Sequence, residues 1–240
     1  LRRPMNIMSG DSPEQMRALE AAAVNHGATW SGLMEHAGAG VARIALELLN
    51  DSANRAALVL VGPGNNGGDG LVTARLLSDA GVAVELYIWR RKEDRADHNW
   101  QMCRERGLYE TRSTDDPDRA GLRARVTGCD LIVDALLGHG ANREVEGELA
   151  SIIANLNETV ADLKTTSGGP LVLSIDVPSG IHADSGALLG DAIRADATAS
   201  TGPIKRGLLR YPARGRAGTI VSVDIGLSTA ELEDCMTELI

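Results

Sequence analysis

Two aspartates and one lysine follow apolar segments of this 240-residue sequence, at positions where side chains often bind ions or move protons. Asp134 and Asp176 each end an apolar segment long enough for a strand, and Lys205 follows a third, weaker one. A carboxylate at the end of a buried strand is costly unless it is paired, hydrogen-bonded or bound to a cation. Each aspartate could instead cap the next turn, and Lys205 could be an ordinary solvated side chain. The residue types therefore indicate acid–base or cation chemistry, with turn capping as the alternative.

A glycine-rich segment, residues 62–70, lies between an apolar and a helix-prone segment and reads Gly-Pro-Gly-Asn-Asn-Gly-Gly-Asp-Gly. Glycines allow the backbone to approach a ligand closely, and the N-terminus of a following helix offers free N–H donors and a positive dipole end. The segment therefore suits an anionic group such as a phosphate. A tight turn without a ligand is the alternative.

The same segment satisfies the dinucleotide pattern GxGxxG, which is weak support by itself. The next expected strand ends in Arg90 and Arg91 rather than in the acid that holds a ribose, so an NADP-dependent oxidoreductase stays an alternative. Asp69 argues against it, because this carboxylate would repel a pyrophosphate at the end of the helix. A P-loop is excluded, because Gly68 stands where its lysine is required.

The segments that position these residues alternate between strand-like and helix-like patterns. Strands are expected at 57–61, 82–89, 130–134, 171–176, 195–200 and 219–224, and helices at 12–26, 31–50, 71–80, 94–106 and 147–156. This alternation predicts an α/β fold with a mostly parallel sheet between helices. The carboxyl ends of parallel strands share one edge of the sheet, so the chemistry-bearing residues should meet in one crevice. We expect one domain over residues 1–240, with N-terminal helices at about 12–50 and an α/β core at about 55–227.

Composition and charge narrow the classes of function. The net charge of −9 without a basic face makes nucleic acid and membrane surfaces poor partners. No apolar stretch approaches the ~20 residues that span a bilayer. The three cysteines lie far apart and predict neither a disulfide framework nor a zinc site, so we expect a cytoplasmic protein. Because the sequence starts with Leu1, we expect a shortened or processed N-terminus.

Several motifs, in order, resemble those of the NAD(P)H-hydrate epimerase family. The residues that carry the resemblance are 64–70 (Gly-Asn-Asn-Gly-Gly-Asp-Gly), 134–138 (Asp-Ala-Leu-Leu-Gly), 176–181 (Asp-Val-Pro-Ser-Gly-Ile), Lys205 with 207–209, and 224–226. Residues 33–38 (Leu-Met-Glu-His-Ala-Gly) also resemble a helical element of the family, with His36 where Asn is more usual. The resemblance covers roughly residues 12–227.

The resemblance implies a Rossmann-like three-layer α/β/α sandwich and an isomerase that interconverts the R and S forms of NAD(P)H hydrate (NADHX or NADPHX) at C6 of the nicotinamide ring, as metabolite repair. The implied substrate-binding residues are Asn65, Asn66, Gly67, Gly68, Asp69, Gly138, His139, Gly140, Ala141, Asn142, Arg143, Glu144 and Asp176. The implied potassium ligands are Asn66, Asp134 and Ser179, and such oxygen donors suit a hard cation. A homodimer is implied too, with a fused or separate NAD(P)H-hydrate dehydratase. Because the sequence ends soon after Gly226, we expect no dehydratase domain in this chain.

Asp176 and Lys205 are the expected catalytic residues. One carboxylate can protonate the departing C6 oxygen and later deprotonate its replacement, and Lys205 should lie near the phosphates or Asp176. By residue type, His139 between two glycines is expected at the surface, and the acidic run 115–118 is expected to form a solvated turn. A non-enzymatic scaffold or binding protein of the same fold is the other class of function. Such a scaffold should lose Asp176, Asn66 or Lys205, and this sequence keeps all three.

Overall fold

The computed structural model describes residues 12–25, 27–52, 55–94, 97–166 and 168–226. Its strands form one sheet with the order β3-β2-β1-β4-β5-β6-β7, and every pairing is parallel. The strands are β1 Ala56–Val61, β2 Ala83–Ile88, β3 Tyr109–Arg112, β4 Leu131–Ala135, β5 Leu171–Ile175, β6 Ala197–Thr201 and β7 Thr219–Val223. The expected parallel sheet is confirmed.

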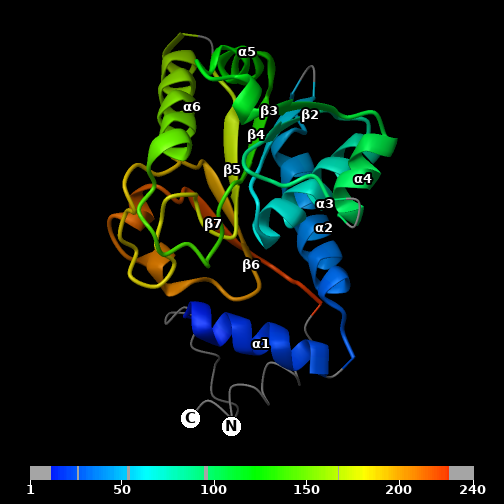
Figure 1. Cartoon of the computed structure of the whole chain (residues 1–240). Coiled ribbons are helices and arrows are strands. Elements are labelled where there is room, and N and C mark those ends of the chain that lie inside the picture. Colours follow the sequence, from blue (N-terminus) through cyan, green and yellow to red (C-terminus); the bar gives the residue numbers. More distant parts are fainter. Residues whose placement is uncertain (1–11, 26, 53–54, 95–96, 167, 227–240) are drawn as a thin grey trace.

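Helices cover both faces of this sheet and make a three-layer sandwich (Figure 1). The helices are α1 Pro13–Asn25, α2 Trp30–Leu48, α3 Asn65–Asp79, α4 His98–Glu105, α5 Ala120–Gly128 and α6 Gly147–Thr166. Helices α2, α3 and α4 lie on one face, and α5 and α6 lie on the other (Figure 1). None of the helices in the described ranges is long and apolar enough to cross a membrane.

The alternation of side chains along β1 divides the core into two layers. Ala57, Val59 and Val61 belong to the cluster that includes α2 and α3, whereas Leu58 and Leu60 belong to the cluster that includes α6. All five are buried, as a central parallel strand requires. Fully burying each of the larger ones contributes roughly 1.5–3 kcal/mol.

The strand order places a ligand crevice between β1 and β4. From β1 the chain winds through β2 to β3 at one edge, and then returns to β4 and winds to β7 at the other edge. The loops that follow β1 and β4 therefore diverge, and open α/β sheets bind ligands at this switch point, outside the carboxyl ends of the strands.

Helix α3 begins at Asn65, six residues before the expected start at residue 71. Glycine disfavours helix by about 1 kcal/mol per residue, so local propensity predicts a loop here. The packing requires glycine instead: a Cβ on Gly67 would lie 2.0 Å from the carbonyl oxygen of Gly62, and one on Gly68 would lie 2.6 Å from Met34. These glycines therefore serve close packing within the protein.

Two elements were not expected from the sequence, β3 and α5, and the expected solvated turn at 115–118 is exposed except at Asp116. Strand β3 is a sheet edge without a buried residue, so its pattern carries no apolar signal. Asp116, expected in a solvated turn, is buried and accepts hydrogen bonds from the Tyr87 hydroxyl and from the N–H groups of Gly121 and Leu122. Its carboxylate orders the start of α5.

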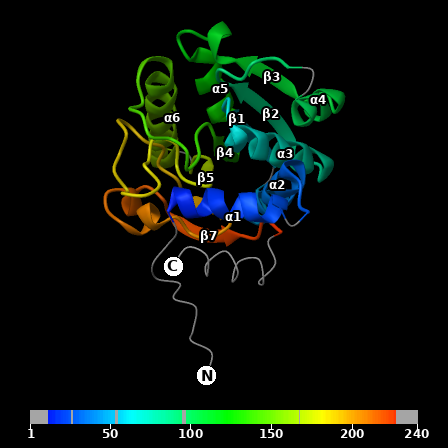
Figure 2. The same cartoon turned by 60° about the horizontal axis from the view of Figure 1, so that its bottom comes forward.

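Helix α1 has defined ends and lies at the edge of the sheet where the strands end (Figures 1 and 2). Ser12 and Gln15 form a capping box, with the Ser12 N–H donating to Gln15 Oε1 at 2.8 Å and the Gln15 N–H donating to Ser12 Oγ at 3.2 Å. Gly27, with φ at +106°, ends the helix in a conformation that side chains rarely adopt. The expected helix 12–26 is confirmed over Pro13–Asn25.

Candidate active site at the carboxyl edge of the sheet

Asp176 follows β5 in a left-handed backbone conformation, with φ at +68°, and is 2% exposed. A non-glycine residue in this region carries strain on the order of 1–3 kcal/mol, and such strain clusters at functional sites. Burial of a carboxylate adds a further penalty unless donors surround it. The structure therefore retains two unfavourable features at this position, which the surrounding contacts must offset.

Three neighbours hold the Asp176 carboxylate. Lys205 Nζ lies 2.5 Å from Oδ1, and the Thr201 hydroxyl donates to the same oxygen at 3.2 Å. Oδ2 accepts the His139 N–H at 2.6 Å and lies 2.8 Å from His139 Nδ1, which must carry the proton because a carboxylate only accepts. Burial alone would raise the pKa of Asp176, but the Lys205 ammonium and the hydrogen bonds from His139 hold this pKa far below its usual range. The surroundings of Asp176 therefore favour its ionised form at neutral pH.

The expectation that His139 is a surface residue was wrong. Its imidazole is 19% exposed and reaches Asp176 because the loop after β4 turns back at residues 138–141, with the Ala141 N–H donating to the Gly138 carbonyl at 3.0 Å. A Cβ on Gly138 would lie 3.0 Å from Asp176 Oδ2, so any other residue here would press against that carboxylate. The Gly-His-Gly pattern of residues 138–140 was the sequence feature from which this turn could have been predicted.

Lys205 is completely buried, against the alternative of a solvated side chain. Its ammonium pairs with Asp176 and also donates to the carbonyl oxygen of Thr201. The structure thus places Lys205 at Asp176, one of the two expected locations. Because the Lys205 side chain has no exposed surface, its role is to hold the Asp176 side chain in place and to stabilise its negative charge.

Asp134, at the end of β4, holds the turn that follows Asp176. Its Oδ1 accepts from Ser179 Oγ at 2.6 Å and from the Leu136 N–H at 3.3 Å, and its Oδ2 accepts from Ser174 Oγ and the Ser179 N–H, both at 2.8 Å. Complete burial raises the pKa of Asp134, and the hydrogen bonds from Ser179 oppose this. The loops after β4 and β5 are therefore fastened to each other through one carboxylate.

Asn66, in the first turn of α3, joins the same loops but keeps one polar atom unpaired. Its amide donates to the carbonyl oxygens of Leu137 at 2.8 Å and Ile175 at 3.4 Å. Its Oδ1 is buried and has no hydrogen-bond partner among the residues that the structure describes. A buried acceptor without a donor is unusual in proteins and often marks an ion or a water.

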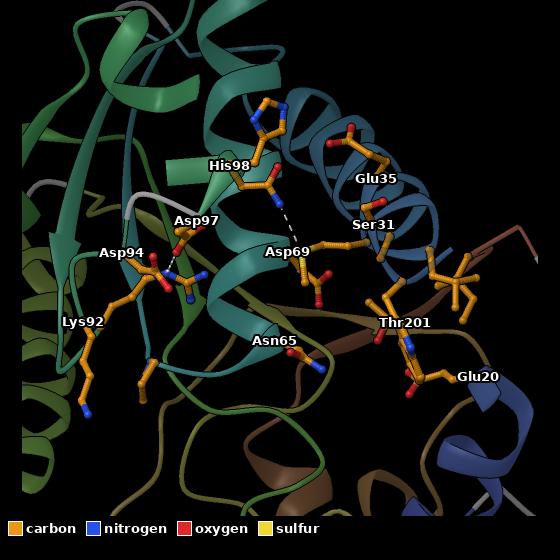
Figure 3. Close-up of a pocket in the computed structure, with 18 of the residues that line it drawn as sticks. Glu20, Ser31, Glu35, Asn65, Asp69, Lys92, Asp94, Asp97, His98 and Thr201 are labelled. Carbon is orange, nitrogen blue, oxygen red and sulfur yellow. Dashed lines mark hydrogen bonds and ion pairs between the residues drawn. The ribbon is translucent and has the colours of Figure 1, made fainter. Parts of the chain in front are cut away.

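A cleft of about 980 Å³ lies next to this cluster, because Thr201, which donates to Asp176, is in its lining (Figure 3). The side chains of Asp176, His139 and Lys205 themselves are not part of that lining. Its lining includes Asn65, Asp69, Thr201 and Glu20 at one end, and it extends to Trp30 and Lys92. Burial raises the pKa of Asp69 well above its usual range, and the carboxylates of Asp176 and Glu20 raise it further. The site therefore pairs an ionised aspartate with one that tends to hold a proton, the arrangement that acid–base catalysis uses.

Other sequence-predicted residues lie farther from this cluster. Gly67 and Gly68 are buried against protein atoms, and residues 140–144 form a mostly exposed loop that contributes nothing to the lining of the cleft in the described ranges. Arg91 donates to the carbonyls of Gly62 and Gly64 and pairs with Asp97 at 2.6 Å. Sequence reasoning missed Glu20 and Trp30 on the cleft wall.

Known proteins resemble this chain over most of its length. Residues 31–207 match the family model described as YjeF-related protein N-terminus. The chain is 37% identical over 216 residues to a bifunctional NAD(P)H-hydrate repair enzyme Nnr of Thermofilum pendens, covering 89% of this chain and 39% of that relative. It is 36% identical over 214 residues to an NAD(P)H-hydrate epimerase of Limosilactobacillus fermentum, covering 88% and 93% of the two chains.

The fold is shared with a solved structure as well. The crystal structure of yeast ynu0 matches with a TM-score of 0.73 at 21% identity, covering 88% of this chain and 86% of the yeast chain. The chain spans only 39% and 41% of the length of two bifunctional relatives, those of Thermofilum pendens and Thermanaerovibrio acidaminovorans.

Proposed function

We propose that this chain, which belongs to the family of YjeF-related protein N-termini, epimerises the R and S forms of NAD(P)H hydrate at C6 of the nicotinamide ring. The observation that carries the proposal is the strained, buried and ionised Asp176, held by Lys205 and His139 beside a cleft large enough for a dinucleotide. A fold does not need a buried ion pair in a strained backbone for stability, so a catalytic use accounts for it best.

The proposed chemistry begins at the C6 hydroxyl, which forms a hemiaminal with the ring nitrogen N1. The N1 lone pair expels the oxygen as a protonated leaving group, and the planar ring then carries positive charge. The fixed Asp176 carboxylate stabilises that charge, because a preorganised charge in a dry site needs no reorganisation. Water adds to the other face of the ring, and the proton returns to the group that supplied it. Opening of the ring to an aldehyde is the other route, and it needs a larger rotation inside a cleft with short, glycine-defined loops.

The oxidoreductase alternative is not favoured. Arg91, which could have met a 2′-phosphate, is engaged with Asp97 and with two carbonyls of the glycine-rich segment. The cleft instead presents carboxyl groups at the expected nicotinamide end. Isomerisation needs such groups and no redox partner.

A test of the function follows the R hydrate by chromatography in the presence of a dehydratase that consumes only the S form. The chain should convert all of the R hydrate, whereas the dehydratase alone should leave it. If R hydrate persists at substrate concentrations that saturate related epimerases, the proposal is wrong. Under the same conditions, the chain should not oxidise simple alcohols with NADP.

We also propose a potassium ion beside the nicotinamide site, with Asn66, Asp134 and Ser179 as the residues that hold it. The unpartnered Oδ1 of Asn66 fits such an ion, and oxygen donors suit a hard cation. Because both Asp134 oxygens already accept two hydrogen bonds each, we propose that Asp134 contributes mainly its negative charge. When bound, the ion would offset the carboxylates of the site and fix the Asn66 side chain.

Replacing Asn66 with Ala should remove the stabilisation of the fold by potassium. A ligand that binds only the folded state at 100 times its Kd adds about 2.7 kcal/mol, and each kcal/mol shifts Tm by about 2–4 °C for a chain of this size. Potassium chloride should therefore raise the Tm of the wild type by several degrees more than choline chloride does, and should not do so for Asn66→Ala. Asn65→Ala, at the neighbouring exposed position, is the control that should keep the effect. An equal potassium shift in all three proteins would place the ion elsewhere.

For the rest of the assembly, we propose one domain over residues 1–240 that acts as a cytoplasmic homodimer. Its product, the S hydrate, suits an NAD(P)H-hydrate dehydratase, and relatives named bifunctional repair enzymes support a fused or separate partner of that kind.

A further inference from the structure

Helix α1 places a carboxylate on its buried face. Met16, Leu19 and Ala23 are 1%, 4% and 1% exposed and form the stripe that packs inward. Glu20 lies four residues after Met16 and three before Ala23, so helical periodicity puts it on the same face. A charged residue on such a stripe is unfavourable unless something in the site uses it.

The position of α1 over the site is fixed by close packing. Met16 forms a cluster with Ala37 of α2 and with Ile225, which follows β7. A Cβ on Gly202, just after β6, would lie 2.8 Å from Met16 Cε, so the methionine occupies the space that glycine leaves. Together with the capping box at its start, this packing fixes which face of the helix meets the cleft.

Glu20 reaches from α1 into the cleft beside Thr201, across from Asn65 and Asp69 (Figure 3). Its carboxyl group makes no hydrogen bond or ion pair with any residue that the structure describes. The side chains with the largest effect on its charge are His139, Asp176 and Lys205 from the site and Arg17 from its own helix, and Glu20 in turn affects Asp69 of α3.

Two carboxyl groups, those of Glu20 and Asp69, thus share one cleft, and the ionised Asp176 lies next to it, bound to the cleft residue Thr201. Burial raises the pKa of Glu20, the His139 charge opposes this, and the Asp176 carboxylate raises it again. Neighbouring carboxyls that interact strongly titrate as a pair and tend to retain one proton between them. Both oxygens of Asp176 already have donors, whereas the carboxyl groups of Glu20 and Asp69 line the cleft itself.

We propose that Glu20 is a further catalytic residue, whose carboxyl group donates the proton to the C6 oxygen of the substrate. This inference rests on the proposed function. The O–H bond of Glu20 breaks as the C6–O bond breaks, so that water leaves, the N1 lone pair forms the C=N bond, and Glu20 is left as a carboxylate. When water adds to the opposite face of the ring, its proton returns to Glu20 and the N1 lone pair is restored. No oxidant or second substrate is consumed.

Family membership does not assign this role, because Glu20 lies outside the matched residues 31–207. Helix α1 would then supply the general acid, Glu20. The loops after β4 and β5 would supply the fixed negative charge of Asp176. The division also supplies a proton donor for the leaving oxygen, which the two predicted catalytic residues do not offer: the pKa of Asp176 is lowered, and the Lys205 ammonium is completely buried against Asp176.

The test compares Glu20→Gln with Glu14→Gln, which removes an exposed carboxylate from the same helix. Glu20→Gln should lower kcat on the order of 10²-fold, the effect of losing a general acid, with KM within a few-fold. Its Tm should be equal to or above that of the wild type, because a partly buried charge is removed. Glu14→Gln should keep wild-type kcat. Glu20→Asp, which keeps a carboxyl group, should recover part of the rate.

The dependence of kcat on pH separates a proton donor from a merely structural residue. The wild-type rate should fall as pH rises and the carboxyl pair loses its proton, and Glu20→Gln should lose this alkaline limb. Equal kcat values for Glu20→Gln and Glu14→Gln would overturn the inference, as would a loss of Tm that accounts for the loss of rate. A wild-type chain that leaves the R hydrate unchanged would overturn the proposed function itself, which is a separate and recognisable result.

Discussion

Asp176→Asn should lower the rate of epimerisation by about 10²–10⁴-fold while dinucleotide binding stays within several-fold. The amide keeps the shape of the side chain but removes the negative charge that, in the proposed mechanism, stabilises the ring. It also leaves the buried ammonium of Lys205 without its counter-charge. Steady-state kinetics with the R hydrate, together with the Kd of an unreactive dinucleotide, measures the two effects separately.

The control for Asp176→Asn is Asp130→Asn at the opposite end of the sheet. Asp130 Oδ2 accepts the Ala56 N–H at 2.9 Å, so this change also removes a carboxylate that binds backbone. It lies just before β4, far from the carboxyl edge, and it should leave kcat near that of the wild type. Near-normal turnover by Asp176→Asn would remove this residue from the mechanism.

Lys205→Met should destabilise the fold by about 3–5 kcal/mol at neutral pH, because it leaves a buried carboxylate unpaired. The pKa of Asp176 is lowered in the wild type, so its stabilising contribution is present above the unfolded-state pKa and is lost as pH falls through the folded-state one. Without the ammonium, burial should raise that pKa instead. The variant should then gain stability relative to the wild type as pH falls and Asp176 takes up a proton. Urea unfolding at pH 7 and pH 5 measures both the loss and its reversal.

The matched control is Lys164→Met, which breaks an ion pair with Asp196 whose side chains are 35% and 33% exposed. Such a pair contributes about 1 kcal/mol or less. The double variant Asp176→Asn with Lys205→Met should recover most of the lost stability but none of the activity, because no unpaired charge remains. If Lys205→Met unfolds at the same urea concentration as the wild type, the buried ion pair is not what holds this turn.

The sequence could predict those parts of the candidate site whose positions follow from the parallel order of the strands. Asp134 and Asp176 end apolar segments, and parallel strands must bring such residues to one edge. It could not predict that His139 turns back onto Asp176, because that contact joins residues 37 positions apart and depends on the space at Gly138. It likewise could not place Asp116, whose burial follows from packing against Tyr87.

The glycine-rich segment borders the cleft, as the sequence predicted, but ligand binding explains only part of its glycine content. Residues 62–70 were expected to form a loop that cradles phosphate, and the segment does border the cleft through Asn65 and Asp69. Most of its glycines are explained by protein neighbours, since Gly62, Gly67 and Gly70 would each collide with backbone or with Ala135 if they carried a Cβ, whereas Gly64 has open space around it. Glu20 had a readable signal, a charge in the stripe of Met16, Leu19 and Ala23, but a single helix does not reveal what lies beneath it.

The left-handed backbone at Asp176 bears on how this chain could change over time. Glycine adopts that conformation without strain, so a substitution to Gly, combined with an apolar residue at position 205, would relieve both the backbone and the buried charges. Random mutation reaches such stabilising changes readily, and only a demand for activity opposes them. A chain that served merely as a scaffold would drift toward the relaxed version. We therefore expect relatives that keep this fold without the proposed chemistry to lose the pair of Asp176 and Lys205 first.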